Sequence, residues 1–266
     1  MQTPGCPEAR QPPLPHKQHH GEKRPVITFQ DVNVIYEDNH IIIVNKQSGE
    51  IVQGDKTGDR TLADDVKEYI KEKYAKPGAV FLGTVHRLDR PVSGIVLFAR
   101  TSKALTRLND MFRKGEVHKT YHAIVPREAE NPAKGAAERQ HLHEGITLRH
   151  YLTRNERQNK AYALNHEKPG AKLALLDVRT IAAAEKVQLL EVNLHTGRHH
   201  QIRCQLAAIG LPIRGDLKYG APRSNPDGSI CLHARHIEFE HPVSHQRISV
   251  TADYPATGLW TLFGTR

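Results

Sequence analysis

Cysteine is scarce in this chain of 266 residues. Only Cys6, Cys204 and Cys231 occur, and they form neither a CxxC motif nor a pairing pattern. This scarcity argues against a disulfide framework and for a reducing compartment. Apolar runs are also short: none approaches the length of a membrane-spanning helix, and the N-terminus lacks the apolar core of a signal peptide. We therefore expect a cytoplasmic protein that is not embedded in a membrane.

Motifs that would bind a nucleotide or a metal are missing as well. In the stretch Gly54–Gly58, the second glycine is followed by Asp59-Arg60 rather than by the lysine and the Ser or Thr of a phosphate-binding loop, and no serine-nucleophile motif occurs. His195, His199 and His200 lie close together, with Cys204 on the same predicted helix face as His200. No second ligand pair has a suitable spacing, so we expect no metal site.

Positive charge is what the sequence has in excess. It contains 38 Lys and Arg against 29 Asp and Glu, a formal net charge of +9, and a further 18 histidines. Aromatic residues make up only 6% of the chain. Such a chain suits a polyanionic partner, and RNA or DNA is the first candidate. Charge alone fits a soluble basic protein without such a partner equally well.

The pattern of apolar residues predicts an α+β fold. Residues 1–24 are rich in proline and histidine and carry Leu14 as their only large aliphatic residue, so we expect a disordered leader. Residues 25–266 should form the folded domain. Its predicted strands outnumber its helices and often follow one another directly, as in a mixed, mainly antiparallel sheet. We predict strands at Val32–Tyr36, Ile41–Asn45, Phe81–Leu88, Gly94–Ala99, Lys119–Val125, Gly145–Thr153, Leu173–Thr180, Val187–Leu194, Ile230–Phe239 and Arg247–Thr251, helices at Thr61–Tyr74, Lys103–Lys114 (capped by Ser102) and Arg198–Ile209, a mobile loop or insertion at Pro126–Leu142, and a weakly patterned connection at Asn155–Gly170.

The turn between the predicted strands Phe81–Leu88 and Gly94–Ala99 is the most informative stretch. It presents Asp89 between Arg87 and Arg90, whose positive charges favour the ionised carboxylate. A loop held between two strands is a rigid place for a single reactive group. On these residues alone, an arginine-rich turn with a local ion pair is an equally good interpretation.

Two further segments concentrate polar groups. Tyr121 lies in a predicted strand, where a tyrosine is more often a packing residue than a functional one. The segment Thr196–Arg203 places two arginines, two histidines and a glutamine around a predicted helix start, where backbone donors favour anions. Arg203 lies at the edge of the apolar stripe of that helix, so we expect it to pair with a carboxylate.

Several segments resemble, in order, the motifs of the RluA family of RNA pseudouridine synthases. His86-Arg87-Leu88-Asp89 followed by Ser93-Gly94 resembles the family signature, although Val92 stands where a threonine is usual. Gln47 likewise replaces a proline usual near the start of the domain. The resemblance covers most of residues 32–241, in the segments Ile35–Lys46, His86–Gly94, Lys119–Val125 and Thr196–Gly220, with a structural C-terminal match at Leu232–Ala234 and His241-Pro242.

The resemblance implies a pseudouridine synthase fold, a bent sheet with a basic cleft, that isomerises specific uridines in rRNA or tRNA without a cofactor. Asp89 matches the essential aspartate, Tyr121 the tyrosine that lies against the target base, and Arg203 the arginine that pairs with the aspartate. Whether Asp89 attacks the ribose or withdraws a proton stays open. Arg87 matches the arginine that fills the gap left by a flipped uridine. The basic side chains beside these motifs are expected to contact RNA: His86, Arg87, Arg90, Lys119 and Arg198.

Many members of this family carry a small RNA-binding module before the catalytic domain. Here the matching segments begin near residue 32, so we expect no such module, and RNA docking should rest on the catalytic domain. We expect a monomer. The alternative function is a catalytically inactive RNA-binding or ribosome-assembly protein on the same scaffold. The joint presence of Asp89, Tyr121 and Arg203 favours the enzyme, and a metal-dependent hydrolase built on the histidines is a distant third possibility.

Overall fold

The computed structural model describes residues 32–54, 58–129 and 132–264, so the predicted leader, residues 1–24, lies outside the described residues. The strands are β1 (Val34–Glu37), β2 (Ile41–Lys46), β3 (Gly83–Thr84), β4 (Ser93–Ala99), β5 (His118–Pro126), β6 (Ile146–Asn155), β7 (Lys160–Leu164), β8 (Lys172–Ala183), β9 (Val187–Leu194), β10 (Leu232–Glu240) and β11 (Arg247–Thr251). The helices are α1 (Leu62–Lys73), α2 (Ser102–Lys114), α3 (Ala136–Gln140) and α4 (Gln201–Ala208), with short 3-10 turns η2 (Leu217–Tyr219) and η3 (Gly258–Leu262).

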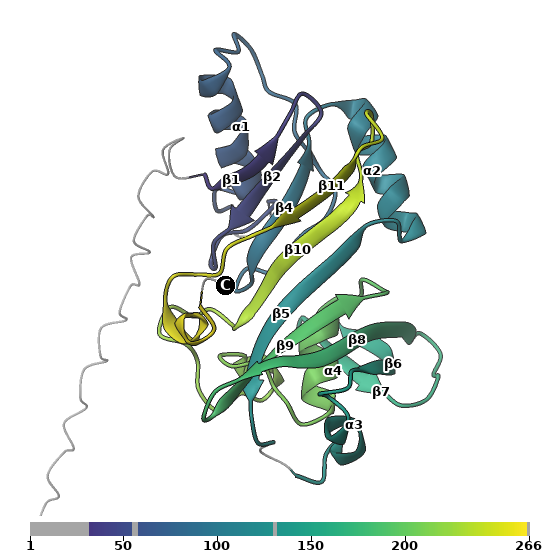
Figure 1. Cartoon of the computed structure of the whole chain (residues 1–266). Helices are drawn as coiled ribbons and strands as arrows, with labels where there is room; N and C mark the ends of the chain where they lie inside the picture. The colour runs from purple at the N-terminus through teal and green to yellow at the C-terminus, as the bar shows by residue number, and fades with distance from the viewer. Residues whose placement is uncertain (1–31, 55–57, 130–131, 265–266) are drawn as a thin grey trace, which may run out of the picture.

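All the described strands join one sheet in the order β1-β2-β4-β10-β5-β9-β8-β6-β7, with β3 beside β4 and β11 beside β10 (Figure 1). Among the described strands, every pairing is antiparallel except that of β4 with β10. The predicted α+β class and mainly antiparallel sheet are therefore confirmed. None of the helices in the described residues is long and apolar enough to cross a membrane.

The central strands of the sheet are buried from solvent. Every residue of β2 and β4 is buried, as continuous apolar runs such as Ile41–Val44 require. Phe98 on β4 and Ile124 on β5 are both 0% exposed and belong to the same apolar cluster. The loop that leads into β4 and the polar side chains of β5 are thus attached to a rigid, close-packed frame.

Helix boundaries follow side-chain capping. In α1, Thr61 and Asp64 form the capping box that the sequence allows. The predicted cap of α2 was wrong by one residue, because Thr101 rather than Ser102 accepts the backbone N–H of Ala104, at 3.2 Å. Gly115 ends α2 in the left-handed conformation, with φ 77°.

The predicted strand Phe81–Leu88 is reduced to the two residues of β3. The reason lies in the neighbouring edge of β4, which pairs with β3 at its end and with β10 at its start. The chain after β3 therefore leaves the sheet, and the ring of His86 replaces a backbone partner by accepting the N–H of Leu97 at 3.0 Å. The segment that carries Asp89 is consequently a loop over most of its length.

Three other predictions need correction. The connection Asn155–Gly170 contains the strand β7, which pairs with β6. The predicted mobile loop at Pro126–Leu142 includes α3 and, over its described part, packs against the end of α4: a Cβ on Gly135 would lie 2.5 Å from the Cα of Ile209. The helix predicted to start at Arg198 starts at Gln201, because the preceding residue has a left-handed backbone.

Candidate active site

Asp89 lies in the loop that leads into β4, and buried groups fix the backbone of this loop. Lys46 at the end of β2 is 0% exposed and donates from Nζ to the carbonyl oxygens of Arg90 and Val92, at 3.2 and 2.6 Å. The N–H of Val92 also bonds to the carbonyl of Asp89, at 3.0 Å, which closes a tight turn. Asp89 is therefore presented from a constrained turn, as the sequence predicts.

Gly94 allows β10 to pair beside this loop. A Cβ at Gly94 would lie 2.4 Å from the carbonyl oxygen of Ala234, and the φ of +111° is unfavourable for other residues. On the preceding residue, the hydroxyl of Ser93 lies 2.9 Å from Nδ1 of the fully buried His233. The Ser-Gly pair thus joins two strands that are far apart in the sequence.

Arg203 on α4 makes the predicted contact with Asp89. Its Nη1 donates to Oδ2 of Asp89 at 2.9 Å. The edge of the guanidinium formed by Nε and Nη2 is held by Asp216, with Nε donating to Oδ2 at 2.6 Å and Nη2 to Oδ1 at 2.8 Å. Arg203 and Asp216 are only 6% and 1% exposed, so this pair is sheltered from water. Sequence reasoning missed Asp216, which was visible only as part of a turn.

A histidine is the second neighbour of Asp89. Nε2 of His200 lies 3.3 Å from Oδ2 of Asp89, and its Nδ1 lies 2.9 Å from the hydroxyl of Tyr219. Burial lowers the pKa of His200 to about 3, so the ring is neutral near pH 7. The sequence offered His200 only as a potential metal ligand, not as a neighbour of Asp89.

The potential metal ligands are arranged differently from the sequence cluster. Asp89, His199 and His200 place three ligand atoms within 4.8 Å of one another. His195 instead pairs with Asp177 at 2.6 Å, away from this group. The Asp89 carboxylate already faces a guanidinium, and the rings of His199 and His200 are stacked, with centroids 3.8 Å apart.

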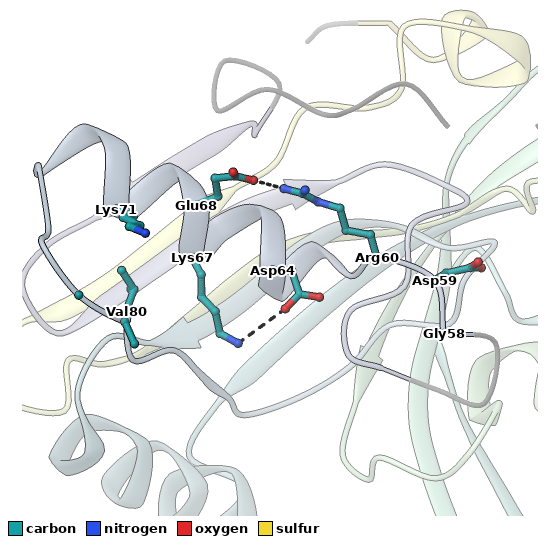
Figure 2. Close-up of a pocket in the computed structure, with 10 residues that line it drawn as sticks. Gly58, Asp59, Arg60, Asp64, Lys67, Glu68, Lys71 and Val80 are labelled. Carbon is teal, nitrogen blue, oxygen red and sulfur yellow. Dashed lines mark hydrogen bonds and ion pairs between the residues drawn. The ribbon is translucent and has the colours of Figure 1, made fainter. Parts of the chain in front are cut away.

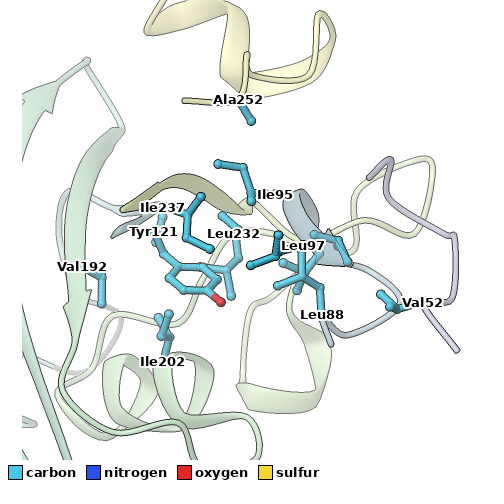
Figure 3. Packing of buried hydrophobic residues seen from close by; sticks show 14 of the residues in the cluster. Val52, Leu88, Ile95, Leu97, Tyr121, Val192, Ile202, Leu232, Ile237 and Ala252 are labelled. Atoms are coloured by element: carbon cyan, nitrogen blue, oxygen red, sulfur yellow. The ribbon is translucent and has the colours of Figure 1, made fainter. Parts of the chain in front are cut away.

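Tyr121 on β5 reaches the same place from the sheet. It is 8% exposed, and its ring lies between Ile202 and Leu232 (Figure 3). Burial, with a smaller contribution from the charge of Asp89, holds the pKa of the Tyr121 hydroxyl well above its usual range. Tyr121, Asp89 and Arg203 line one cavity of about 100 Å³. The three predicted catalytic residues are therefore brought together.

This cavity opens beside a larger groove of about 760 Å³, here called the basic groove. The two share Arg87, Asp89, Tyr121, Arg198 and His200 among their lining residues. Six lysines and arginines line the groove: Arg87, Arg113, Lys114, Lys119, Arg154 and Arg198. Asp89 is the only carboxylate among the lining residues, so the groove attracts polyanions.

A hollow of about 890 Å³ lies elsewhere, along α1. Its charged side chains pair with one another, with Arg60 contacting Glu68 and Lys67 lying 3.7 Å from Asp64 (Figure 2). Both signs of charge occur side by side, and the hollow shares no residue with the basic groove. It has the character of a solvated helix surface.

Comparison with known proteins decides the family. Residues 40–208 match the family model described as RNA pseudouridylate synthase. This chain belongs to the RNA pseudouridylate synthase family. The matching region contains Asp89, Tyr121 and Arg203, so the predicted RluA-type membership is confirmed, and the chain is assigned to the RNA-modifying isomerases.

Individual relatives agree. The chain is 30% identical to tRNA pseudouridine synthase C of Yersinia pestis, over 88% of this chain and 91% of that one. It is 32% identical to ribosomal large subunit pseudouridine synthase C of Vibrio vulnificus, over 85% and 67%. In tRNA pseudouridine synthase C of Pectobacterium carotovorum subsp. carotovorum it spans only 62% of the relative, at 30% identity. Human RNA pseudouridylate synthase domain containing 4 has the same fold, with a TM-score of 0.67 at 18% identity and coverage of 87% and 92%.

Within this pseudouridine synthase fold, the predicted RNA contacts fall into two groups. Arg87, Lys119 and Arg198 line the basic groove. His86 lines it too, but its Nε2 is bonded to the backbone, and burial lowers its pKa to about 3. Arg90 lines neither cavity and pairs with Asp59 at 2.8 Å. The sequence did not indicate the other basic groove residues, because they lie outside the matching segments: Arg113, Lys114 and Arg154.

Proposed function

We propose that this protein converts specific uridines in rRNA or tRNA into pseudouridine, with Asp89 as the reacting group and without a cofactor. The observation that carries this proposal is the position of Asp89, held by Arg203 in a small cavity that shares lining residues with the basic groove. Relatives named for tRNA and for the large ribosomal subunit support both classes of RNA. A monomeric state and a cytoplasmic location remain predictions.

The hydrogen bonds around Arg203 leave Asp89 with reactive charge. Arg203 gives two of its three hydrogen bonds to Asp216 and one to Asp89. Two carboxylates against one guanidinium leave one net negative charge. Because Asp216 is the better-bonded partner, that charge remains largely on Asp89. A carboxylate in this state can attack the ribose or withdraw a proton.

The reaction itself needs no redox partner or group donor. The bond from the ribose to N1 of uracil breaks, and a bond to C5 of the same base forms. C5 loses a proton and N1 gains one, so atoms balance within the nucleotide. The protonated hydroxyl of Tyr121 beside the cavity is suited to donate a hydrogen bond to the base while its ring packs against it.

Access requires the uridine to leave its stack. A base inside folded RNA cannot enter a cavity of about 100 Å³ beside the basic groove without flipping. Arg87 is exposed and lines both cavities, so it is placed to fill the gap in the RNA. The remaining groove cations would neutralise phosphates and set the position of the RNA.

The test is a pseudouridine map of total RNA from cells with and without the gene. We expect one or more uridines to lose the modification on deletion and to regain it with the wild-type gene but not with Asp89→Asn. This variant should be folded and should bind RNA at least as tightly as the wild type, because one negative charge leaves a basic groove. An unchanged map would contradict the proposal. RNA binding without conversion would favour the inactive binder.

A further inference from the structure

Asp89 is held from a second direction that the proposed function does not use. His200 comes just before α4, with its side chain 4% exposed and Nε2 3.3 Å from Oδ2 of Asp89. Its backbone is left-handed, with φ 52° and ψ 27°. A non-glycine residue in this conformation is strained and persists where the surroundings over-determine it. In this backbone conformation the ring lies against the carboxylate that Arg203 also contacts.

Hydrogen bonds behind the ring decide which nitrogen carries the proton. The hydroxyl of Tyr219 accepts the N–H of Ala161 at 2.8 Å and lies 2.9 Å from Nδ1 of His200. Tyr219 is buried, so its own O–H proton needs an acceptor, and Nδ1 supplies one. The proton of the neutral imidazole is then on Nε2, the atom that faces Asp89. The opposite tautomer would set a lone pair against a carboxylate.

The ring stays neutral throughout the working pH range. Burial dominates, and the facing charges oppose one another, since Asp89 favours the protonated ring while Arg203 and Lys218 disfavour it. His200 can therefore orient Asp89 without cancelling the negative charge left to it. The ionisable groups around the ring, from the Asp89 loop, the residue before His200, α4 and η2, are Asp89, His199, Arg203, Lys218 and Tyr219.

We propose that His200 is a positioning residue: its Nε2–H, fixed by Tyr219, and Arg203 together hold Oδ2 of Asp89 and leave Oδ1 to face the substrate. Both contacts reach the same oxygen. No hydrogen bond or ion pair from a described residue reaches Oδ1. The inference rests on the proposed function and adds which oxygen reacts and what orients it.

The test compares three substitutions at His200 in the full-length protein. Glutamine can place an amide N–H near the position of Nε2, asparagine reaches only as far as Nδ1, and leucine donates nothing. The substrate is an RNA hairpin carrying a uridine found in the deletion map, and the measurements are RNA affinity and the single-turnover rate. We expect His200→Leu and His200→Asn to lose about 10- to 100-fold in rate, as for a misplaced catalytic group, with affinity within about twofold. His200→Gln should recover most of the rate.

The outcomes are separable from those of the proposed function. If the wild type does not convert the hairpin, the function fails; if it converts while Asp89→Asn does not, the function stands and the variants test His200. Equal rates for wild type and His200→Leu would overturn the proposal, as would a loss confined to affinity. Should His200→Leu not fold by circular dichroism, the glutamine–asparagine pair decides, and equal rates for these two would overturn it.

Discussion

Replacing Asp216 by asparagine would remove one charge from the most sheltered ion pair of the site. Asp216 is 1% exposed and bonds Arg203 through both oxygens. Breaking a buried pair by removing one partner costs about 3 to 5 kcal/mol. Asparagine keeps the size and one acceptor, and Asp89 still contacts Arg203, so we expect a smaller loss of about 2 to 3 kcal/mol in the free energy of unfolding. This corresponds to a melting temperature lower by about 5 to 10 °C.

The same substitution should also slow the reaction. With Asp216 neutral, the guanidinium of Arg203 is compensated by Asp89 alone, and the net charge of the three groups rises from −1 to 0. A fully compensated Asp89 is a weaker nucleophile and a weaker base. We expect the single-turnover rate of Asp216→Asn to fall by about tenfold or more, equivalent to at least about 1.4 kcal/mol in activation free energy.

Thermal unfolding and single-turnover conversion measure the two effects separately. Glu68→Gln is a matched control, because it neutralises a carboxylate that pairs with Arg60 on the exposed surface of α1. An exposed pair contributes about 0 to 1 kcal/mol, so this control should unfold and react like the wild type. The reasoning is refuted if Asp216→Asn keeps the wild-type melting temperature and rate, or if the control loses as much.

Three further outcomes follow from the charges and burial of the described residues. Stability should decline as pH falls below about 6.5, because burial lowers the pKa of His233 to about 3 and of His122 to about 4. The unfolded chain then binds more protons than the folded one. At pH 5 each histidine should lower the free energy of unfolding by about 2 kcal/mol, which urea unfolding can measure. Activity should survive exhaustive chelation, since the proposed chemistry uses one carboxylate; loss with EDTA and recovery with zinc would instead implicate Asp89, His199 and His200. RNA affinity should fall steeply with salt, with a log–log slope of up to about 4 to 5 if all six groove cations reach phosphates, and a flat titration would contradict the basic groove.

Local sequence patterns were sufficient to predict most strands of the sheet. Alternation and apolar runs predicted β2, β4 and β9 closely, because each segment carries the apolar residues that it buries against its neighbouring strands. The strand predicted before Asp89 was largely wrong for a non-local reason. The same edge of β4 pairs with β10 at Ser93 and Gly94, and no pattern within residues 81–88 shows that a distant strand will share that edge.

The active site likewise contains contacts that the sequence predicted and contacts that it did not. The family resemblance brought Asp89 and Arg203 together in advance, and the contact is present at 2.9 Å. Asp216 and His200 were not predicted as neighbours of these groups, because their roles depend on where two turns meet in space. Arg90, adjacent to Asp89 in sequence, turns instead to Asp59. Adjacency in the chain is a weak guide to side-chain direction in a loop, where no regular periodicity constrains it.

The pairing of β4 with β10 also has a consequence for how the molecule is made. Ser93 and His233, which meet there, are separated by 140 positions in the chain. Contacts between such distant residues close large loops and form late in folding. During synthesis, the loop of Asp89 leaves the ribosome long before β10 can brace it. A nascent chain that already contains Asp89, Tyr121 and Arg203 therefore still lacks β10, whose Leu232 also lines the cavity. RNA-modifying activity would report that the C-terminal strands have docked.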